Sequence, residues 1–129
     1  MKDSFGRLMI DIEGTSLTHD DKSILSNNQV GGVIFFSRNF ESYDQIKGLI
    51  SEIKNIKQNI IFAVDQEGGR FQRFKNDFTL MPSLQDLSKY SDANKIDMCK
   101  EVAWLTSSEL LATGCLLYTS DAADETCRV

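Results

Sequence analysis

The sequence predicts an α/β fold in which parallel strands alternate with helices. Three short segments, residues 8–12, 30–36 and 60–64, are runs of mostly apolar residues rather than alternations of apolar and polar ones. Continuous hydrophobicity is typical of strands that are covered on both faces. Helical patterns separate the three segments, and the order strand, helix, strand, helix, strand implies parallel strands joined by crossover helices.

The first helix is expected directly after the first strand segment. Thr18 suits an N-cap, and Asp20 and Asp21 lie in the first turn, where the helix dipole favours negative charge. The second helix is expected over residues 42–57, because isoleucine and leucine recur there at spacings of three and four. These two helices supply the crossovers between the three strands.

A third helix is expected over residues 93–112, with Gly114 as the residue that ends it. The segment between the third strand and this helix, residues 65–91, is predicted to be a long loop, which in a compact domain is usually functional or disordered. The inward face of the third helix is predicted to be formed by Ile96, Cys99, Val102, Ala103, Leu105 or Thr106, Leu110 and Ala112.

Composition excludes several classes of function. The net charge of −5 gives no support for a surface that tracks nucleic-acid phosphates. No apolar run approaches the roughly 18 residues that span a bilayer, and the N-terminus has no signal-peptide pattern, so a cytoplasmic protein is expected. The three cysteines form no close pair, and no cofactor, disulfide or metal site is predicted.

The most informative position is Asp65, at the carboxyl end of the third predicted strand. Ligands bind at that end in α/β barrels, and a carboxylate there can accept hydrogen bonds from neighbouring hydroxyls of a sugar. It can equally cap loop amides or pair with an arginine. Gly68 and Gly69 permit a tight turn or a close approach to a ligand. Arg70 and Arg73 can bind a ligand, remain solvated or pair with an acid such as Glu67.

Residues 64–73, with the pattern Asp-Gln-Glu-Gly-Gly-Arg-x-Gln-Arg after an apolar strand, resemble the signature of bacterial family 3 β-N-acetylhexosaminidases. The resemblance runs from about Leu8 to Gly114. It implies the N-terminal part, about three β/α units, of a TIM-type (β/α)8 barrel. Supporting matches are Asp11-Ile12-Glu13-Gly14, Val30-Gly31-Gly32 and Phe36-Ser37-Arg38-Asn39.

The resemblance assigns two substrate contacts to this chain. The first aspartate and the last arginine of the motif, Asp65 and Arg73, are implied to contact a terminal N-acetylglucosamine. Phe71 stands where the family often has a smaller aliphatic residue, which leaves the polar roles intact. Arg38 and Asn39 are expected to brace the carboxyl end of the sheet.

The catalytic groups of the resembling family lie elsewhere. Its enzymes release terminal β-linked N-acetylglucosamine through a covalent glycosyl-aspartate, and cytoplasmic members recycle peptidoglycan and often act as monomers. Their aspartate nucleophile and acid/base histidine would both follow residue 114, so no catalytic residue is expected here. His19, the only histidine, is expected to be a solvated side chain in the first turn of a surface helix.

Two further expectations concern the chain as a whole. The alternative to an enzyme is a non-catalytic sugar- or nucleotide-binding α/β module, although no GxGxxG or GxxxxGK[ST] motif supports the nucleotide version. Residues 115–125 resemble no family strand and look like a translated transposon adapter from sequencing-library preparation. The chain is therefore divided into a barrel portion, 1–114, and a non-native tail, 115–129, and is expected to be inactive alone. Whether the glycan is a muropeptide or derived from chitin stays open.

Overall fold

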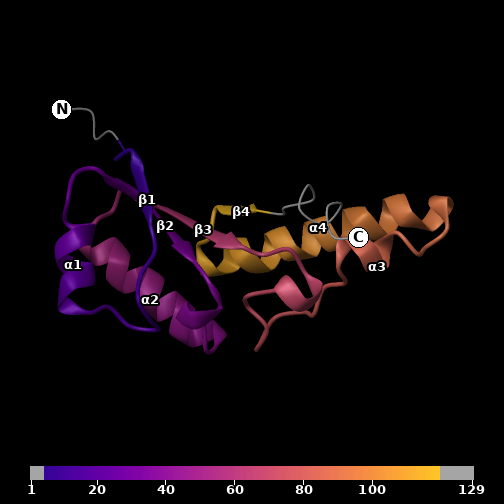
Figure 1. Cartoon of the computed structure of the whole chain (residues 1–129), viewed down its shortest axis with the longest axis horizontal. Coiled ribbons are helices and arrows are strands. Elements are labelled where there is room, and N and C mark those ends of the chain that lie inside the picture. The colour runs from indigo at the N-terminus through magenta and orange to yellow at the C-terminus, as the bar shows by residue number, and fades with distance from the viewer. Residues whose placement is uncertain (1–4, 120–129) are drawn as a thin grey trace.

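The computed structural model describes residues 5–119, without the side chains of residues 92, 93 and 119. Its strands form one parallel sheet in the order β1-β2-β3-β4 (Figure 1). The predicted α/β class with parallel strands is confirmed. In chain order the elements are β1 (Leu8–Ile10), α1 (His19–Leu25), β2 (Val30–Phe35), the 3-10 turn η1 (Ser37–Asn39), α2 (Tyr43–Ile56), β3 (Ile61–Asp65), the 3-10 turn η2 (Gly69–Phe71), α3 (Leu84–Leu87), α4 (Asp92–Thr113) and β4 (Leu117–Thr119).

The centre of the sheet is the pairing of β2 with β3. Their register runs from Gly32 beside Ile61 to Phe35 beside Val64. Every residue of β2 except Ile34 is buried, as continuous hydrophobicity predicts for a strand covered on both faces. Gly31 is required by a close approach, because a Cβ there would lie 2.0 Å from the carbonyl oxygen of Gly6.

Helix α1 begins where Thr18 predicts. The Thr18 hydroxyl accepts a hydrogen bond from the Asp21 N–H at 3.1 Å, and the Asp21 carboxylate accepts one from the Thr18 N–H at 2.9 Å. This reciprocal capping box satisfies two backbone donors that the helix itself leaves unpaired. Asp21 therefore caps the helix in addition to its favourable interaction with the helix dipole.

Helix α2 covers the middle of the sheet with its apolar face. Its N-cap is Ser42, whose hydroxyl accepts from the Gln45 N–H at 3.2 Å. Burial of each large apolar side chain contributes about 1.5–3 kcal/mol. The centre of the core is formed by buried residues of α2 and of the two central strands: Ile46, Leu49, Ile50, Ile53, Val30, Val33, Phe35, Phe62 and Val64. Seven further buried side chains complete it: Ile12, Leu25, Ile60, Phe74, Phe78, Leu110 and Cys115.

The inward face predicted for α4 is wrong in its N-terminal half. Ile96 is 63% exposed, whereas Thr106 and Leu110 are buried. Cys99, Ala103 and Ala112, which we expected to face inward, are also exposed. The cause is length: α4 has 22 residues, about 33 Å at 1.5 Å per residue, and extends past the short strands (Figure 1).

The end of α4 and the segment after it continue the sheet. Gly114 ends the helix in the left-handed conformation, with φ 100°, as its position predicts. Cys115 is buried, and burial raises the pKa of its thiol to about 11, so the thiol stays protonated. Leu117–Thr119 then form β4 beside β3, so the sheet has four strands rather than the three we expected. The non-native origin of residues 115–129 stays a prediction, and residues 120–129 lie outside the described part.

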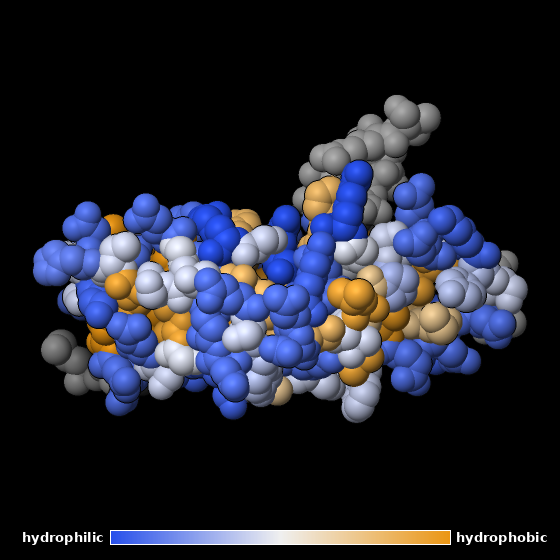
Figure 2. Space-filling view, turned by 90° about the horizontal axis from the view of Figure 1, so that it is seen from below, coloured by the Kyte–Doolittle hydropathy of each residue, from blue (hydrophilic) through white to orange (hydrophobic). Residues whose placement is uncertain are grey.

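The described part of the chain contains no helix that is both long and apolar enough to cross a bilayer. It does carry apolar side chains on its surface, among hydrophilic ones (Figure 2). These exposed side chains include Leu8 and Met9 on β1 and Leu117 on β4, the two edge strands of the sheet. Exposed strand edges with apolar side chains favour association with other chains.

We predict that the 129-residue chain, expressed alone, aggregates or fails to unfold cooperatively as a monomer. The physical reason is that, among residues 5–119, both edge strands of the parallel sheet pair on one side alone and carry exposed apolar side chains. Sedimentation and thermal unfolding followed by circular dichroism measure this. A sharp unfolding transition from a monodisperse monomer would contradict the prediction.

Candidate functional site

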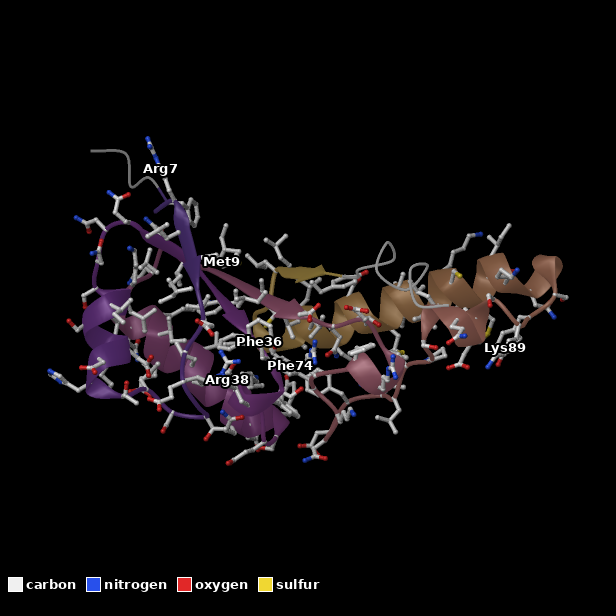
Figure 3. The ribbon with its side chains drawn as sticks, in the orientation of Figure 1. Arg7, Met9, Phe36, Arg38, Phe74 and Lys89 are labelled. Atoms are coloured by element: carbon white, nitrogen blue, oxygen red, sulfur yellow. The ribbon has the colours of Figure 1, made fainter. Side chains whose placement is uncertain are left out.

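The candidate site lies at the carboxyl edge of the sheet. Because all four strands are parallel, the segments that follow β1, β2 and β3 leave the sheet at this same edge. Phe36 and Arg38 come from the segment that follows β2, and Phe74 comes from the segment that follows β3 (Figure 3). The motif of residues 64–73 begins inside β3 and continues along this edge.

The structure brings Asp65 and Arg73 into direct contact. Asp65 is the last residue of β3, and its Oδ2 lies 2.6 Å from Arg73 Nη2. Arg73 Nε also donates to the main-chain oxygen of Asp65 at 3.0 Å. The side chains are 21% and 24% exposed, so the ion pair is partly shielded from water.

This pairing is one of the roles that the sequence left open for Asp65. A carboxylate offers about four lone-pair sites and a guanidinium five N–H donors, so both groups can take part in more than one hydrogen bond at a time. A ligand with neighbouring hydroxyls could donate to Asp65 and accept from Arg73 while the two stay paired. The arrangement can therefore present a hydrogen-bond acceptor, Asp65, and an adjacent donor, Arg73, to a polyhydroxylated ligand.

Two glycines turn the chain between these partners. Gly68 and Gly69 have φ values of 81° and 53°, a left-handed conformation that disfavours side chains. A Cβ on Gly68 would lie 2.6 Å from the carbonyl oxygen of Pro82. The Gly69 N–H donates to the Met81 carbonyl at 2.8 Å. The predicted tight turn is confirmed. The two glycines pack closely against Met81 and Pro82, which lie later in the same loop.

Two buried glutamines within the motif organise the loop, and the sequence did not single them out. Gln66 is 4% exposed and Gln72 is 2% exposed. Gln66 Oε1 accepts from the N–H groups of Arg73 and Phe74 at 2.8 and 3.0 Å. Buried amides are normally hydrogen-bonded, because an unpaired one costs free energy. Their position inside the motif was the only available signal.

Arg70 and Phe71 lie on the outer side of the turn. The Arg70 guanidinium lies 4.7 Å from the centre of the Phe71 ring, and that of Arg73 lies 5.8 Å from it. Arg70 is exposed, whereas Arg73 is partly buried. The main-chain N–H of Glu67 donates to the Phe71 carbonyl at 3.5 Å. Of the two motif arginines, Arg73 is the one that the loop holds against the sheet.

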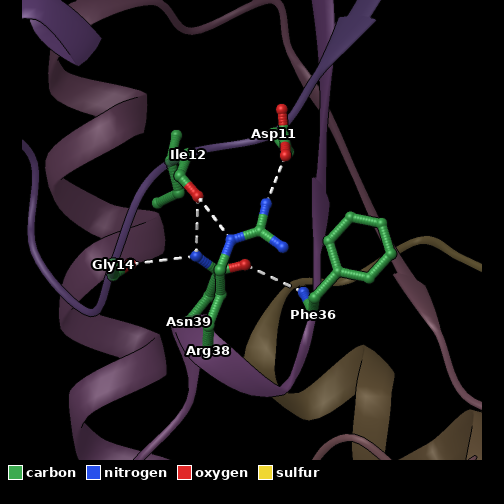
Figure 4. Close-up of polar contacts among 6 residues, drawn as sticks. All are labelled: Asp11, Ile12, Gly14, Phe36, Arg38 and Asn39. Atoms are coloured by element: carbon green, nitrogen blue, oxygen red, sulfur yellow. Dashed lines mark hydrogen bonds and ion pairs between the residues drawn. The ribbon is translucent and has the colours of Figure 1, made fainter.

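Asn39 ties the segments after β1 and β2 together (Figure 4). Its Nδ2 donates to the carbonyls of Ile12 and Gly14, both at 3.0 Å, and its Oδ1 accepts from the Phe36 N–H at 2.9 Å. Arg38 adds a bond from Nε to the Ile12 carbonyl at 3.3 Å and an ion pair with Asp11. The expectation that Arg38 and Asn39 brace this edge is confirmed.

His19 is the first residue of α1 and is exposed, as expected for a solvated side chain. Among residues 5–119, as far as their side chains are described, no three histidine, cysteine or acidic side chains gather in a group that could hold a metal ion.

Comparison with known families assigns this chain. Residues 5–121 match the family described as the glycosyl hydrolase family 3 N terminal domain. The chain belongs to this family. The matched range includes the motif with Asp65 and Arg73, and it extends through β4.

Family 3 relatives of known name and structure agree with this assignment. The chain is 42% identical, over 113 residues, to a beta-hexosaminidase of Hydrogenovibrio crunogenus, which covers 84% of this chain and 32% of that relative. Native NagZ from Neisseria gonorrhoeae superposes with a TM-score of 0.83 at 36% identity, covering 90% of this chain and 35% of NagZ. The same NagZ in complex with N-trifluoroacetyl-D-glucosamine gives a TM-score of 0.80 at 36% identity, covering 86% and 34%.

These comparisons confirm the predicted family and the predicted fold, the N-terminal part of a family 3 barrel. They also show that this family 3 chain spans about a third of the length of the curated relatives that it matches.

We predict that Asn39→Ala lowers the free energy of unfolding of the full-length family 3 protein by about 3 kcal/mol, because it leaves buried backbone groups without their partner. Thermal or denaturant unfolding measures the change. Asn76→Ala is the matched control, since Asn76 is exposed and makes one bond, to the Glu41 carbonyl at 3.0 Å. Equal losses in the two variants would show that the Asn39 bonds do not carry the effect.

Proposed function

We propose that this chain is the substrate-binding N-terminal third of a β-N-acetylhexosaminidase. The full-length enzyme would hydrolyse terminal, non-reducing N-acetyl-D-glucosamine from β-linked glycans. The observation that carries the proposal is the Asp65–Arg73 pair, held at the carboxyl end of β3 within the family motif. The names of the beta-hexosaminidase relatives support it, as does the NagZ structure with a glucosamine derivative.

The pair suits a sugar for chemical reasons. The Asp65 carboxylate would accept hydrogen bonds from neighbouring hydroxyls, and the Arg73 guanidinium would donate to a hydroxyl oxygen. Hydrogen bonds to charged groups are about twice as strong as neutral ones. Because Arg73 already lies 2.6 Å from Asp65, both groups would meet the sugar in a fixed geometry.

The proposed reaction proceeds with retention of configuration, in two steps. An aspartate carboxylate attacks the anomeric carbon while an acid protonates the departing glycosidic oxygen, which forms a glycosyl-aspartate. The acid/base group then deprotonates a water molecule, whose oxygen attacks the anomeric carbon and releases the aspartate. We place that aspartate and an acid/base histidine in the part of the barrel that follows residue 114, so Asp65 and Arg73 bind substrate and neither reacts with it.

The setting of the full-length enzyme belongs to the same proposal. We expect a monomer that acts in the cytoplasm on peptidoglycan fragments, without a cofactor, nucleic acid or membrane partner. The resemblance of residues 64–73 to the cytoplasmic peptidoglycan-recycling type supports this setting.

The domain division also stays a proposal: residues 1–114 belong to the barrel and residues 115–129 are a non-native tail. The DNA sequence of codons 115–125 tests this division. If it is unlike the transposon adapter, the non-native origin of the tail is refuted.

A second candidate is a non-catalytic sugar-binding α/β module. It is favoured by one observation: Asp65 and Arg73 pair at the carboxyl end of β3, where they offer a sugar an acceptor and a donor without reacting with it. The gene sequence after codon 114 discriminates the two candidates. A loop resembling Lys-His-Phe-Pro-Gly-His and a later Ser-Asp-Asp support the glycosidase.

We predict that Asp65→Asn lowers kcat/KM of the full-length enzyme by about 100-fold, since a charged partner of the substrate is lost. Initial rates with 4-nitrophenyl N-acetyl-β-D-glucosaminide measure the change, and Arg73→Lys should behave similarly. Arg70→Lys is the matched control, because Arg70 is exposed and lies in the same loop. Activity of Asp65→Asn within twofold of wild type would contradict its role in binding.

We predict that the purified 129-residue chain releases no chromophore from the same substrate. The reason is that the nucleophile and the acid/base group are both placed outside it. The full-length enzyme, assayed beside it, is the positive control. Release by the chain above the enzyme-free background would refute that placement.

A further inference from the structure

Arg73 is held at both of its ends by residues that adjoin in the sequence. Its guanidinium binds the side chain and the main-chain oxygen of Asp65, at 2.6 and 3.0 Å. Its main-chain N–H donates to Oε1 of Gln66 at 2.8 Å. A pair of neighbouring residues at the end of β3 thus fixes both the backbone and the side chain of Arg73.

The Gln66 oxygen also closes the loop that carries the arginine. Residues 66–72 contain Gly68 and Gly69, both at positive φ, and glycine is the residue whose backbone has the widest choice of conformations. Because Gln66 Oε1 accepts from Arg73 and from Phe74 at 3.0 Å, one side chain brings the end of this turn back to its start. Gln66 is 4% exposed, so water competes little for these bonds.

Phe74, the residue after Arg73, is held by the hydrophobic core. Its side chain is fully buried, stacks on Phe40 with ring centres 4.5 Å apart and packs against Phe35 at 6.5 Å. The backbone of Arg73 is therefore fixed twice: its N–H is bonded to Gln66, and the next residue, Phe74, is buried in the core. Binding groups are most effective when buried neighbours hold them in the productive geometry.

We propose that Gln66 is a positioning residue, which sets the orientation of Arg73 for the sugar without touching the sugar itself. This inference rests on the proposed function of Arg73 as a substrate contact. The Gln66 bonds fix the point from which the Arg73 side chain extends, so the guanidinium reaches Asp65 and the sugar at once. Without them, the Arg73 backbone would lose its hydrogen bond to a buried side chain, and sugar binding would have to supply part of that ordering.

Gln72 serves as the matched control for Gln66. It lies in the same motif and is equally buried, but it braces the later half of the loop. Its Nε2 donates to the carbonyls of Phe74 and Thr79 at 2.8 and 2.9 Å, and its Oε1 accepts from the Met81 N–H at 2.8 Å. Loss of either glutamine disturbs the loop, yet only Gln66 bonds to Arg73 itself.

The test is a double-mutant cycle in the full-length enzyme, read as the inhibition constant of N-acetyl-D-glucosamine, the proposed product. Gln66→Leu and Gln72→Leu are each made with Arg73 and with Arg73→Ala. We expect Gln66→Leu to weaken inhibition about tenfold when Arg73 is present and less than about twofold when it is absent, because its effect passes through Arg73. Gln72→Leu should weaken inhibition by the same factor in both backgrounds.

Gln66→Glu keeps a side-chain oxygen that can accept the two N–H bonds, and it should retain inhibition within about threefold of wild type. If Gln66→Leu does not fold, Gln66→Met, which also lacks the side-chain carbonyl, takes its place in the cycle. A tenfold loss in Gln66→Glu, or an equal effect of Gln66→Leu with and without Arg73, would overturn the positioning role alone. Unchanged inhibition in Arg73→Ala would instead overturn Arg73 as a sugar contact, and the positioning role with it.

Discussion

The parallel pairing of β2 with β3 is the constraint on which the rest of this chain depends. The pairing buries both central strands beneath α2, which explains why their buried residues carry no polar side chains. It also gives the strands one direction, so the segments that follow them meet at one edge. Asp65 reaches that edge as the last residue of β3, and Asn39 reaches it just after β2.

Polar side chains hold this edge together by binding main-chain groups of the segments that follow the strands. Asn39 joins the exits of β1 and β2, whereas Gln66 and Gln72 close successive halves of the loop after β3. The outer part of this loop is fastened to neighbouring helices. Glu109 of α4 accepts from the Thr79 N–H at 3.1 Å, and the Asp77 carboxylate accepts from the Tyr43 N–H at the start of α2 at 3.2 Å.

These fastenings give the Asp65–Arg73 pair its character. An exposed ion pair between long side chains is worth little, because its members must be ordered and water competes for them. Here the backbone of Arg73 is already held by the buried side-chain amide of Gln66 and by its buried neighbour Phe74. The pair is therefore already ordered before a ligand binds, as the proposed role in sugar recognition requires.

The sequence alone determined the order and type of the main elements, because their signals are local. Apolar runs mark the strands, Thr18 caps α1, and Gly114 ends α4 in a conformation that favours glycine. The motif also sufficed to name the family and to select Asp65 and Arg73. Their role as sugar contacts stays a prediction.

The tertiary structure decided what depends on distant neighbours. A helical stripe does not reveal how far the sheet beneath it extends, so the N-terminal half of α4 was wrongly expected to be buried. An isolated glutamine has no pattern that tells a buried brace from a solvated loop residue. Only the folded loop shows that Gln66 turns inward to hold Arg73.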